Sequence, residues 1–350
     1  MTSPSAIPSP GGSDGRVRFL VAPSAWDGSG SAPKDVYDDL DRLVRPDLRN
    51  HYASPLCAHR WLDVCDDPGY GHGELIARTE AALPLVIAAL RADRGAPLRI
   101  ALTSLGPGDG SLDEPVLRAL DREALLASYH GIDSSFELLC RAVRRIATAG
   151  GFRAPFPVTA ICGDFTGLGP GMLETPQLPS VRLFTLTGLT LGNHRESDLL
   201  AVVRGAMGER DYLLLDARLH ALGTNPEANA LAPDVRAALL GNYDLASQRR
   251  FVFGPLELAT LATDENVGFG YELTHRVTVV PSALNLVVFC TGLSTTMRFT
   301  GEPVRRDRLD LGITTLYHLP DLTAWLRTAG FAPVWHGEAN GIALLLLKRC

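Results

Sequence analysis

Residues 98–111 read LRIALTSLGPGDGS, an apolar run that ends in three glycines spaced as GxGxG. Such a run is typical of a buried strand, and helical patterning resumes after it, so the glycines predict a tight turn between a strand and a helix. Glycine at such a turn lets the backbone approach a ligand and directs helix-terminal N–H groups towards it. Gly106, Gly108, Asp109 and Gly110 are therefore candidate cofactor-binding residues.

The spacing of the glycines differs from the GxGxxG of dinucleotide sites, which disfavours a nicotinamide cofactor. By itself GxGxG also suits a strand-to-helix turn that binds nothing. Two later strand ends add acids. Asp133 lies where an acid hydrogen-bonds ribose hydroxyls, and Asp164 with Phe165 suits an adenine amino group and ring. Either acid alone is also typical of a helix cap, but the three features together predict a pocket for an adenosine with a small tail.

Predicted strands and helices alternate around this turn. Strands are predicted at 98–105, 127–132, 158–162, 181–186 and 212–215, and helices at 74–94, 114–119, 135–149 and 196–207. Alternation with short loops predicts parallel βαβ units and a doubly wound α/β sheet. Further on, helical patterning spans 234–264, extended segments span 271–280 and 284–290, and a helix at 322–329 with a strand at 342–347 returns to the sheet.

Composition disfavours several classes of function. The 350 residues are 46% apolar and carry a net charge of −6 without a basic block, so nucleic acid is not an expected partner. The six cysteines lack zinc-ligand spacing, and no metal site is predicted. Residues 1–33, rich in Ser, Gly and Pro, are predicted to be a disordered leader and neither a signal peptide nor a membrane span, so the expected location is the cytoplasm.

Four short motifs resemble those of the histidine-specific Nα-methyltransferases of ergothioneine biosynthesis and their relatives. They are LGPGDGS (105–111), GIDS (131–134), GDF (163–165) and, most specifically, GLTLGN (188–193), and the likeness covers about residues 50–350. The resemblance implies a class I methyltransferase that uses S-adenosylmethionine. The implied fold is a Rossmann-like doubly wound sheet with a second, smaller α+β domain formed by an N-terminal segment and an insertion.

The resemblance also implies a division of the chain. Residues 74–217 and 311–350 would form the S-adenosylmethionine-binding domain, and residues 34–73 with 218–310 would cap the substrate. The three glycines and Asp109 would form the cofactor turn. Asp133, with Ser134 beside it, would contact the ribose or the sulfonium side.

Further roles follow from the same motifs. Asp164 and Phe165 would contact the adenine, and Asn193 would hold the α-carboxylate or the amine of the substrate. Tyr70 and Tyr243 stand at the positions of substrate-side tyrosines. Asn193 also suits a helix cap, and each tyrosine also suits an ordinary half-buried position.

One segment departs from the family pattern. Aligned on Tyr317, the chain has Gly312 where the family has Glu, Thr314 in place of Ser and Leu316 in place of Lys. A site loses much of its discrimination when groups that hydrogen-bond a polar side chain are lost. Thr314 and Tyr317 stay candidate substrate-binding residues, and the substrate is expected to be small and amino-acid-like but not histidine.

The expected reaction is methyl transfer to a nitrogen of such a substrate, free or bound to a carrier protein, in specialised metabolism. Most of the rate would come from holding a neutral nucleophile close to the methyl carbon. An amine must still lose a proton, and Tyr243, Asp244 and His194 are candidate acceptors, although a lone loop histidine is more often simply exposed. Two alternatives stay open: closure of a small ring (azetidine or aziridine type) by internal displacement, and a non-catalytic member that binds a partner.

Overall fold

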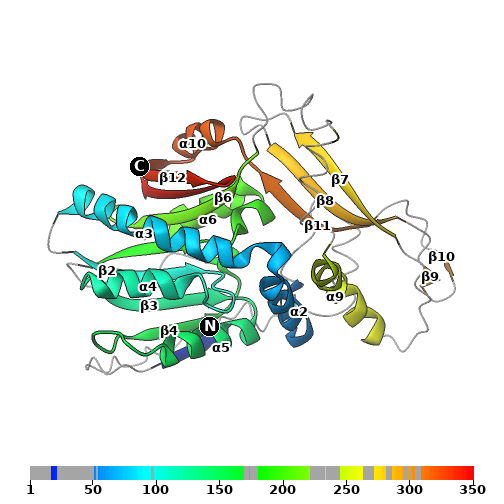
Figure 1. The fold of residues 1–350 in the computed structure, drawn as a ribbon, viewed down its shortest axis with the longest axis horizontal. Coiled ribbons are helices and arrows are strands. Elements are labelled where there is room, and N and C mark those ends of the chain that lie inside the picture. The colour runs from blue at the N-terminus through cyan, green and yellow to red at the C-terminus, as the bar shows by residue number, and fades with distance from the viewer. Residues whose placement is uncertain are drawn as a thin grey trace, which may run out of the picture.

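A computed structural model describes residues 17–21, 51–52, 54–95, 98–168, 173, 180–220, 233, 245–262, 272–280, 286–294, 298–299, 302–303 and 309–350. Its centre is an eight-stranded sheet (Figure 1). Across this sheet the order is β1 (Val17–Val21), β4 (Val158–Cys162), β3 (Leu126–Asp133), β2 (Arg99–Leu105), β5 (Ser180–Leu186), β6 (Tyr212–Arg218), β13 (Ile342–Arg349) and β12 (Phe331–Ala339).

The strands from β1 to β6 pair in parallel, while β13 is antiparallel to both of its neighbours. Helices cover both faces, as a doubly wound sheet requires. One hydrophobic cluster contains buried residues of α3 (His72–Arg94), α4 (Asp113–Arg122) and α5 (Phe136–Thr148), and the other contains those of α6 (Glu196–Ala206) and α10 (Leu319–Thr328). The predicted doubly wound α/β sheet is confirmed.

Continuous apolar runs explain why the central strands are buried on both faces. In β6, Leu213 and Leu215 join the cluster beneath α6, whereas Tyr212 and Leu214 join the cluster beneath α3 and α4. Successive side chains of a strand point to opposite faces, so an unbroken apolar run serves two cores at once. The Leu344–Leu347 run of β13 divides between the same two clusters in the same way.

The predicted disordered leader is wrong for five residues, because Val17–Val21 forms β1, paired in parallel with β4. Without β1, the backbone groups on that edge of β4 would have no strand partner. The rest of the leader lies outside the described residues.

In addition to β1, the sequence patterns missed α2 (Pro55–Asp66), β11 (Leu309–Leu316) and β12. A helix predicted over 234–264 is confirmed as α9 (Ala246–Ala262), with most of the remainder outside the described residues. A second, three-stranded antiparallel sheet has the order β11, β8 (Leu286–Ser294) and β7 (Glu272–Val280), and α9 packs against α2 and β11 (Figure 1). A separate antiparallel pair joins β9 (Arg298–Phe299) to β10 (Glu302–Pro303).

Within the described parts of the chain, no helix has the length and apolarity needed to cross a membrane. The same residues contain no group of three or more His, Cys, Asp or Glu side chains that could hold a metal ion.

Candidate functional site

The glycine turn connects the end of β2 to the start of α4 and bends sharply at each glycine. Gly106, Gly108 and Gly110 have φ angles of +73°, +56° and +80°, a region that side chains with a Cβ rarely adopt. The Gly106 N–H donates to the Ile132 carbonyl at 2.8 Å, which ties the turn to β3. The Gly110 carbonyl accepts from Glu114 at 3.0 Å and so starts the helix.

Asp133 ends β3 beside this turn, with only 6% of its surface exposed. Its Oδ2 accepts from the Gly108 N–H at 3.2 Å and its Oδ1 from the Ser135 N–H at 2.8 Å. Burial raises the pKa of Asp133 to about 6, although both N–H groups oppose that rise. Each carboxylate oxygen keeps a second lone pair that could accept a hydroxyl from a ligand.

Asp164 and Phe165 follow β4 and begin the short helix η4 (Phe165–Gly167). The Asp164 carboxylate accepts from the backbone N–H of Thr166 at 2.8 Å and from its hydroxyl at 2.7 Å, so it also has the capping role that an acid in this position often takes. The ring of Phe165 lies 5.6 Å from that of His194 in a T-shaped contact.

Asn193 ends η5 (Thr190–Asn193), the 3-10 turn that follows β5. The turn begins with Gly188 and Leu189, whose φ angles are +81° and +63°. Buried Asp216 on β6 holds both, because its carboxylate accepts from the Gly188 N–H at 2.9 Å and from the Leu189 N–H at 2.8 Å. A Cβ on Gly192 would lie 2.8 Å from the Thr315 carbonyl, so η5 packs closely on β11.

These strand ends surround one cavity of about 950 Å³, counting the part open to solvent. The structure brings most of the residues predicted from the sequence to its wall: Tyr70, Gly106, Gly108, Asp109, Asp133, Ser134, Asp164, Phe165, Asn193 and His194. The wall therefore combines the four motifs, which are spread over almost ninety positions of the chain, in one site.

Gly110, Thr314 and Tyr317 are not among the lining residues. Gly110 instead packs against α5, and Thr314 is a half-buried residue of β11. The structure corrects the role of Tyr317, because its ring is fully buried in the core and its hydroxyl donates to Glu196 at 2.9 Å.

Two candidate proton acceptors, Tyr243 and Asp244, lie outside the described residues.

Eight of the described lining residues lie outside the quoted motifs and received no site role from the sequence: Tyr52, Trp61, Cys65, His72, Leu75, Leu112, Leu138 and Thr187. Pro107, Ser111, Gly188 and Thr190 also line the cavity and belong to the motifs, but they received no role of their own. Most informative is an aromatic wall formed by Tyr52, Trp61 and Tyr70, with Phe251 of α9 behind it. Trp61 makes T-shaped contacts with Tyr52 at 5.5 Å and with Tyr70 at 5.6 Å, and lies 5.2 Å from Phe251. In the sequence, the position of Tyr70 in the family pattern was the signal for this wall, and no local pattern placed Tyr52 or Trp61 at the cavity.

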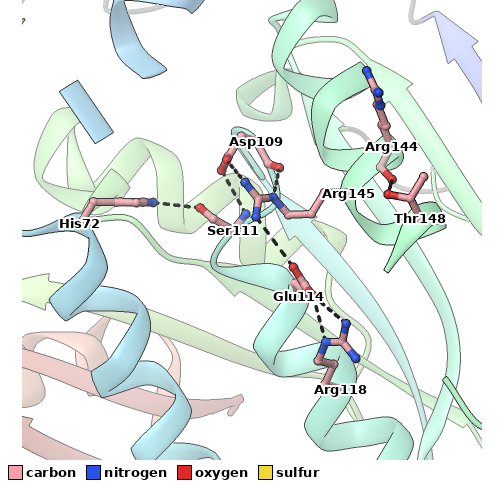
Figure 2. A network of polar contacts seen from close by, with 8 residues as sticks. All are labelled: His72, Asp109, Ser111, Glu114, Arg118, Arg144, Arg145 and Thr148. Carbon is pink, nitrogen blue, oxygen red and sulfur yellow. Dashed lines mark hydrogen bonds and ion pairs between the residues drawn. The ribbon is translucent and has the colours of Figure 1, made fainter. Parts of the chain in front are cut away.

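A polar network connects the cavity to α5 (Figure 2). The Nε2 of His72 lies 2.9 Å from the Ser111 hydroxyl, and the Ser111 N–H donates to Asp109 at 3.0 Å. Arg145 pairs with the Asp109 carboxylate at 2.6 Å and donates to its carbonyl at 3.1 Å. Burial alone would raise the pKa of Asp109, but the Ser111 hydrogen bonds and the Arg145 charge outweigh it and hold that pKa below its usual value.

The charged groups of the wall are of one sign. The described lining residues include three carboxylates, those of Asp109, Asp133 and Asp164, and two histidines, but neither Lys nor Arg. Arg145 already pairs with Asp109, so the carboxylates of Asp133 and Asp164, together with the aromatic rings of the wall, are the groups that favour a positively charged ligand. A ligand with phosphate groups would find no guanidinium or ammonium partner among the described lining residues.

Neither a protein-family model nor a curated protein matches the chain. Similar solved structures include magnesium protoporphyrin IX methyltransferase (ChlM) from Synechocystis PCC 6803 with bound SAH, at 14% identity and a TM-score of 0.44 over 87% of this chain and 98% of that one. An S-adenosylmethionine-dependent methyltransferase from Clostridium acetobutylicum ATCC 824 aligns at 14% identity and a TM-score of 0.40, over 75% of this chain and 89% of that one. The glycopeptide N-methyltransferase MtfA aligns at 13% identity and a TM-score of 0.39, over 78% of this chain and 90% of that one.

These identities and TM-scores are low, so the function proposed for this chain rests on its own residues. The class of fold is defined by the sheet itself. Its parallel strands, with antiparallel β13 between β6 and β12, form the Rossmann-like α/β fold expected of class I methyltransferases.

Proposed function

We propose that this chain is an S-adenosylmethionine-dependent methyltransferase that acts on a nitrogen of a small amino-acid-like substrate other than histidine. One observation carries the proposal: the glycine turn, Asp133 and Asp164 line the same cavity at three adjacent strand ends, and the described wall has no cation for phosphates. This set suits an adenosine attached to a positively charged tail better than a dinucleotide.

Glycine at positions 106 and 108 keeps this part of the cavity wall free of side chains. A Cβ on Gly106 would lie 3.3 Å from the Phe165 ring, and one on Gly108 would lie 3.9 Å from Nε1 of Trp61. Any side chain at these positions would occupy cavity space, so the turn is shaped for close approach of a ligand. Asp133 would accept the ribose hydroxyls, and Asp164 with Phe165 would bind the adenine. When bound, the cofactor supplies an electrophilic methyl group.

The protein's part in the reaction is mainly positioning. Asn193 and Tyr70 would hold the polar end of the substrate, and the aromatic wall of Tyr52, Trp61 and Tyr70 would stabilise positive charge on the amine and the sulfonium. His194 lines the cavity and would accept the proton that the amine loses. We further propose that residues 34–73 and 218–310 form the cap over the substrate.

A product assay tests the reaction. The purified chain, incubated with S-adenosylmethionine and a panel of amino acids and their amides, is expected to produce S-adenosylhomocysteine and a product in which a methyl group replaces one N–H hydrogen of the substrate. Mass spectrometry of both products is the measurement. Methylthioadenosine in place of S-adenosylhomocysteine would contradict methyl transfer and indicate ring closure instead. A chain that binds neither nucleoside is not such an enzyme.

The raised pKa of Asp133 gives a pH prediction. Because that pKa is about 6, the carboxylate is ionised at pH 8 and protonated at pH 5. Protonation removes one charged acceptor for the ribose, so the affinity for methylthioadenosine is expected to fall about tenfold between pH 8 and pH 5. Calorimetric titration at several pH values measures this change. The Asp133→Asn variant is expected to bind methylthioadenosine weakly at both pH values. If its affinity fell as steeply with pH as that of the wild type, Asp133 would not be the titrating ribose acceptor.

A further inference from the structure

His72 begins α3 and points at the start of α4 (Figure 2). Its Nε2 and the Ser111 hydroxyl lie 2.9 Å apart, and both residues line the cavity. Neither has a role in the adenosine and substrate contacts proposed above. A polar pair at a cavity wall, without an assigned partner in the proposed ligand, needs an explanation.

The ion pairs next to His72 are complete without it. Arg145 pairs with Asp109 at 2.6 Å and lies 3.8 Å from Glu114, which also pairs with Arg118 at 2.9 Å. Two carboxylates therefore meet two guanidinium groups. His72 is the member of this network that can gain a charge when a ligand arrives.

Three charged groups act on the His72 ring from the elements around it: Asp66 at the end of α2, Asp109 in the glycine turn and Arg145 on α5. Burial lowers the pKa of His72, and Arg145 lowers it further, while the two aspartates oppose that change. The unliganded ring is therefore neutral near pH 7. An anionic group placed beside it would favour its protonation.

The order of the strands shows which part of the proposed cofactor reaches His72. If adenine lies at the end of β4 and ribose at the end of β3, the amino-acid arm extends to the end of β2, next in the sheet. That end leads through the glycine turn to Ser111. We infer that His72 and Ser111 bind the carboxylate of this arm, an inference that rests on the proposed function.

The chemistry of the pair suits a carboxylate. A protonated His72 can donate a ring N–H to a carboxylate oxygen of the arm, and the Ser111 hydroxyl can donate its single proton to the same carboxylate when it turns away from Asp109. A carboxylate so held forms charge-assisted hydrogen bonds, which are shorter and stronger than neutral ones. The ligand would thus be recognised at its arm as well as at its nucleoside.

Two nucleosides that differ only in the arm test this inference. S-adenosylhomocysteine carries the carboxylate and methylthioadenosine lacks it. In calorimetric titrations, His72→Ala and Ser111→Ala are each expected to weaken S-adenosylhomocysteine binding about tenfold and to change methylthioadenosine binding less than about twofold. His336→Ala, at an exposed position of β12, is the matched control and is expected to change neither affinity.

Proton linkage gives a second readout, one that a purely structural role would not change. Wild-type protein is expected to take up a proton when it binds S-adenosylhomocysteine near pH 7, and this uptake should vanish in His72→Ala. It is measured by titration in buffers of different ionisation enthalpy. Equal weakening of both nucleosides, or unchanged uptake, would overturn the inference while leaving the adenosine site intact. A wild-type chain that binds neither nucleoside would overturn the proposed function as well.

Discussion

Asp133→Ala is expected to lose affinity for S-adenosylhomocysteine by about 100-fold or more. The carboxylate would accept two ribose hydroxyls, and each hydrogen bond to a charged group contributes about 1.5–3 kcal/mol. The same carboxylate holds the Gly108 and Ser135 N–H groups at 3.2 and 2.8 Å, so its removal also releases the turn that approaches the ligand. Isothermal titration with the full chain measures the loss.

Two further variants separate these contributions. Asp133→Asn keeps one acceptor oxygen and a similar shape, so its loss is expected to be smaller, about tenfold. Asp198→Ala removes an exposed carboxylate of α6, which lies 3.9 Å from Arg195 and accepts from the Ser197 hydroxyl at 3.1 Å. This variant is expected to bind as the wild type does. Unchanged S-adenosylhomocysteine affinity in Asp133→Ala would contradict the cofactor site proposed here.

Gly110→Ala is expected to lower the free energy of unfolding by about 2–5 kcal/mol. The φ angle of +80° costs a residue with a Cβ about 1–2 kcal/mol. The new Cβ would also lie 3.0 Å from the Ala142 Cα on α5, and overpacking against backbone costs about 1–3 kcal/mol more. Urea unfolding followed by circular dichroism measures the change.

Gly71→Ala is the matched control for this prediction. Gly71 has a similar φ angle of +78° in the left-handed region, but a Cβ there would meet no atom within 4 Å. Its substitution is expected to cost only the backbone strain, about 1–2 kcal/mol. If both variants lose the same stability, α5 does not pack on the glycine turn as tightly as the structure shows.

Local sequence patterns determined the framework of the site. The apolar run of β2, the three glycines and the acids after β3 and β4 are each recognisable within a few residues, because strand burial and turn geometry depend on near neighbours. Parallel strands that follow one another through helices bring their carboxyl ends to one edge, so the convergence of Asp133 and Asp164 was predictable as well.

Long-range packing decided the rest. Tyr52 and Trp61 reach the cavity because α2 packs against α9, nearly two hundred positions later in the chain. Tyr317, a candidate substrate-binding residue, is instead buried in the core, where its hydroxyl donates to Glu196 on α6. Neither the packing of α9 on α2 nor the contact with Glu196 can be inferred from the sequence near Tyr52, Trp61 and Tyr317.

The pairing of β1 with β4 at the edge of the sheet also depends on the tertiary structure. The short apolar segment of β1 has no helical or strand signal strong enough to stand out among Ser, Gly and Pro, yet it pairs along β4. In the same way, His72 lies beside Ser111 because α3 packs against α4. The sequence by itself therefore determined the central strands of the sheet, the turn and its acids, because these depend on local periodicity. Only the tertiary structure decided which side chains complete the wall, because that depends on contacts between elements far apart in the chain.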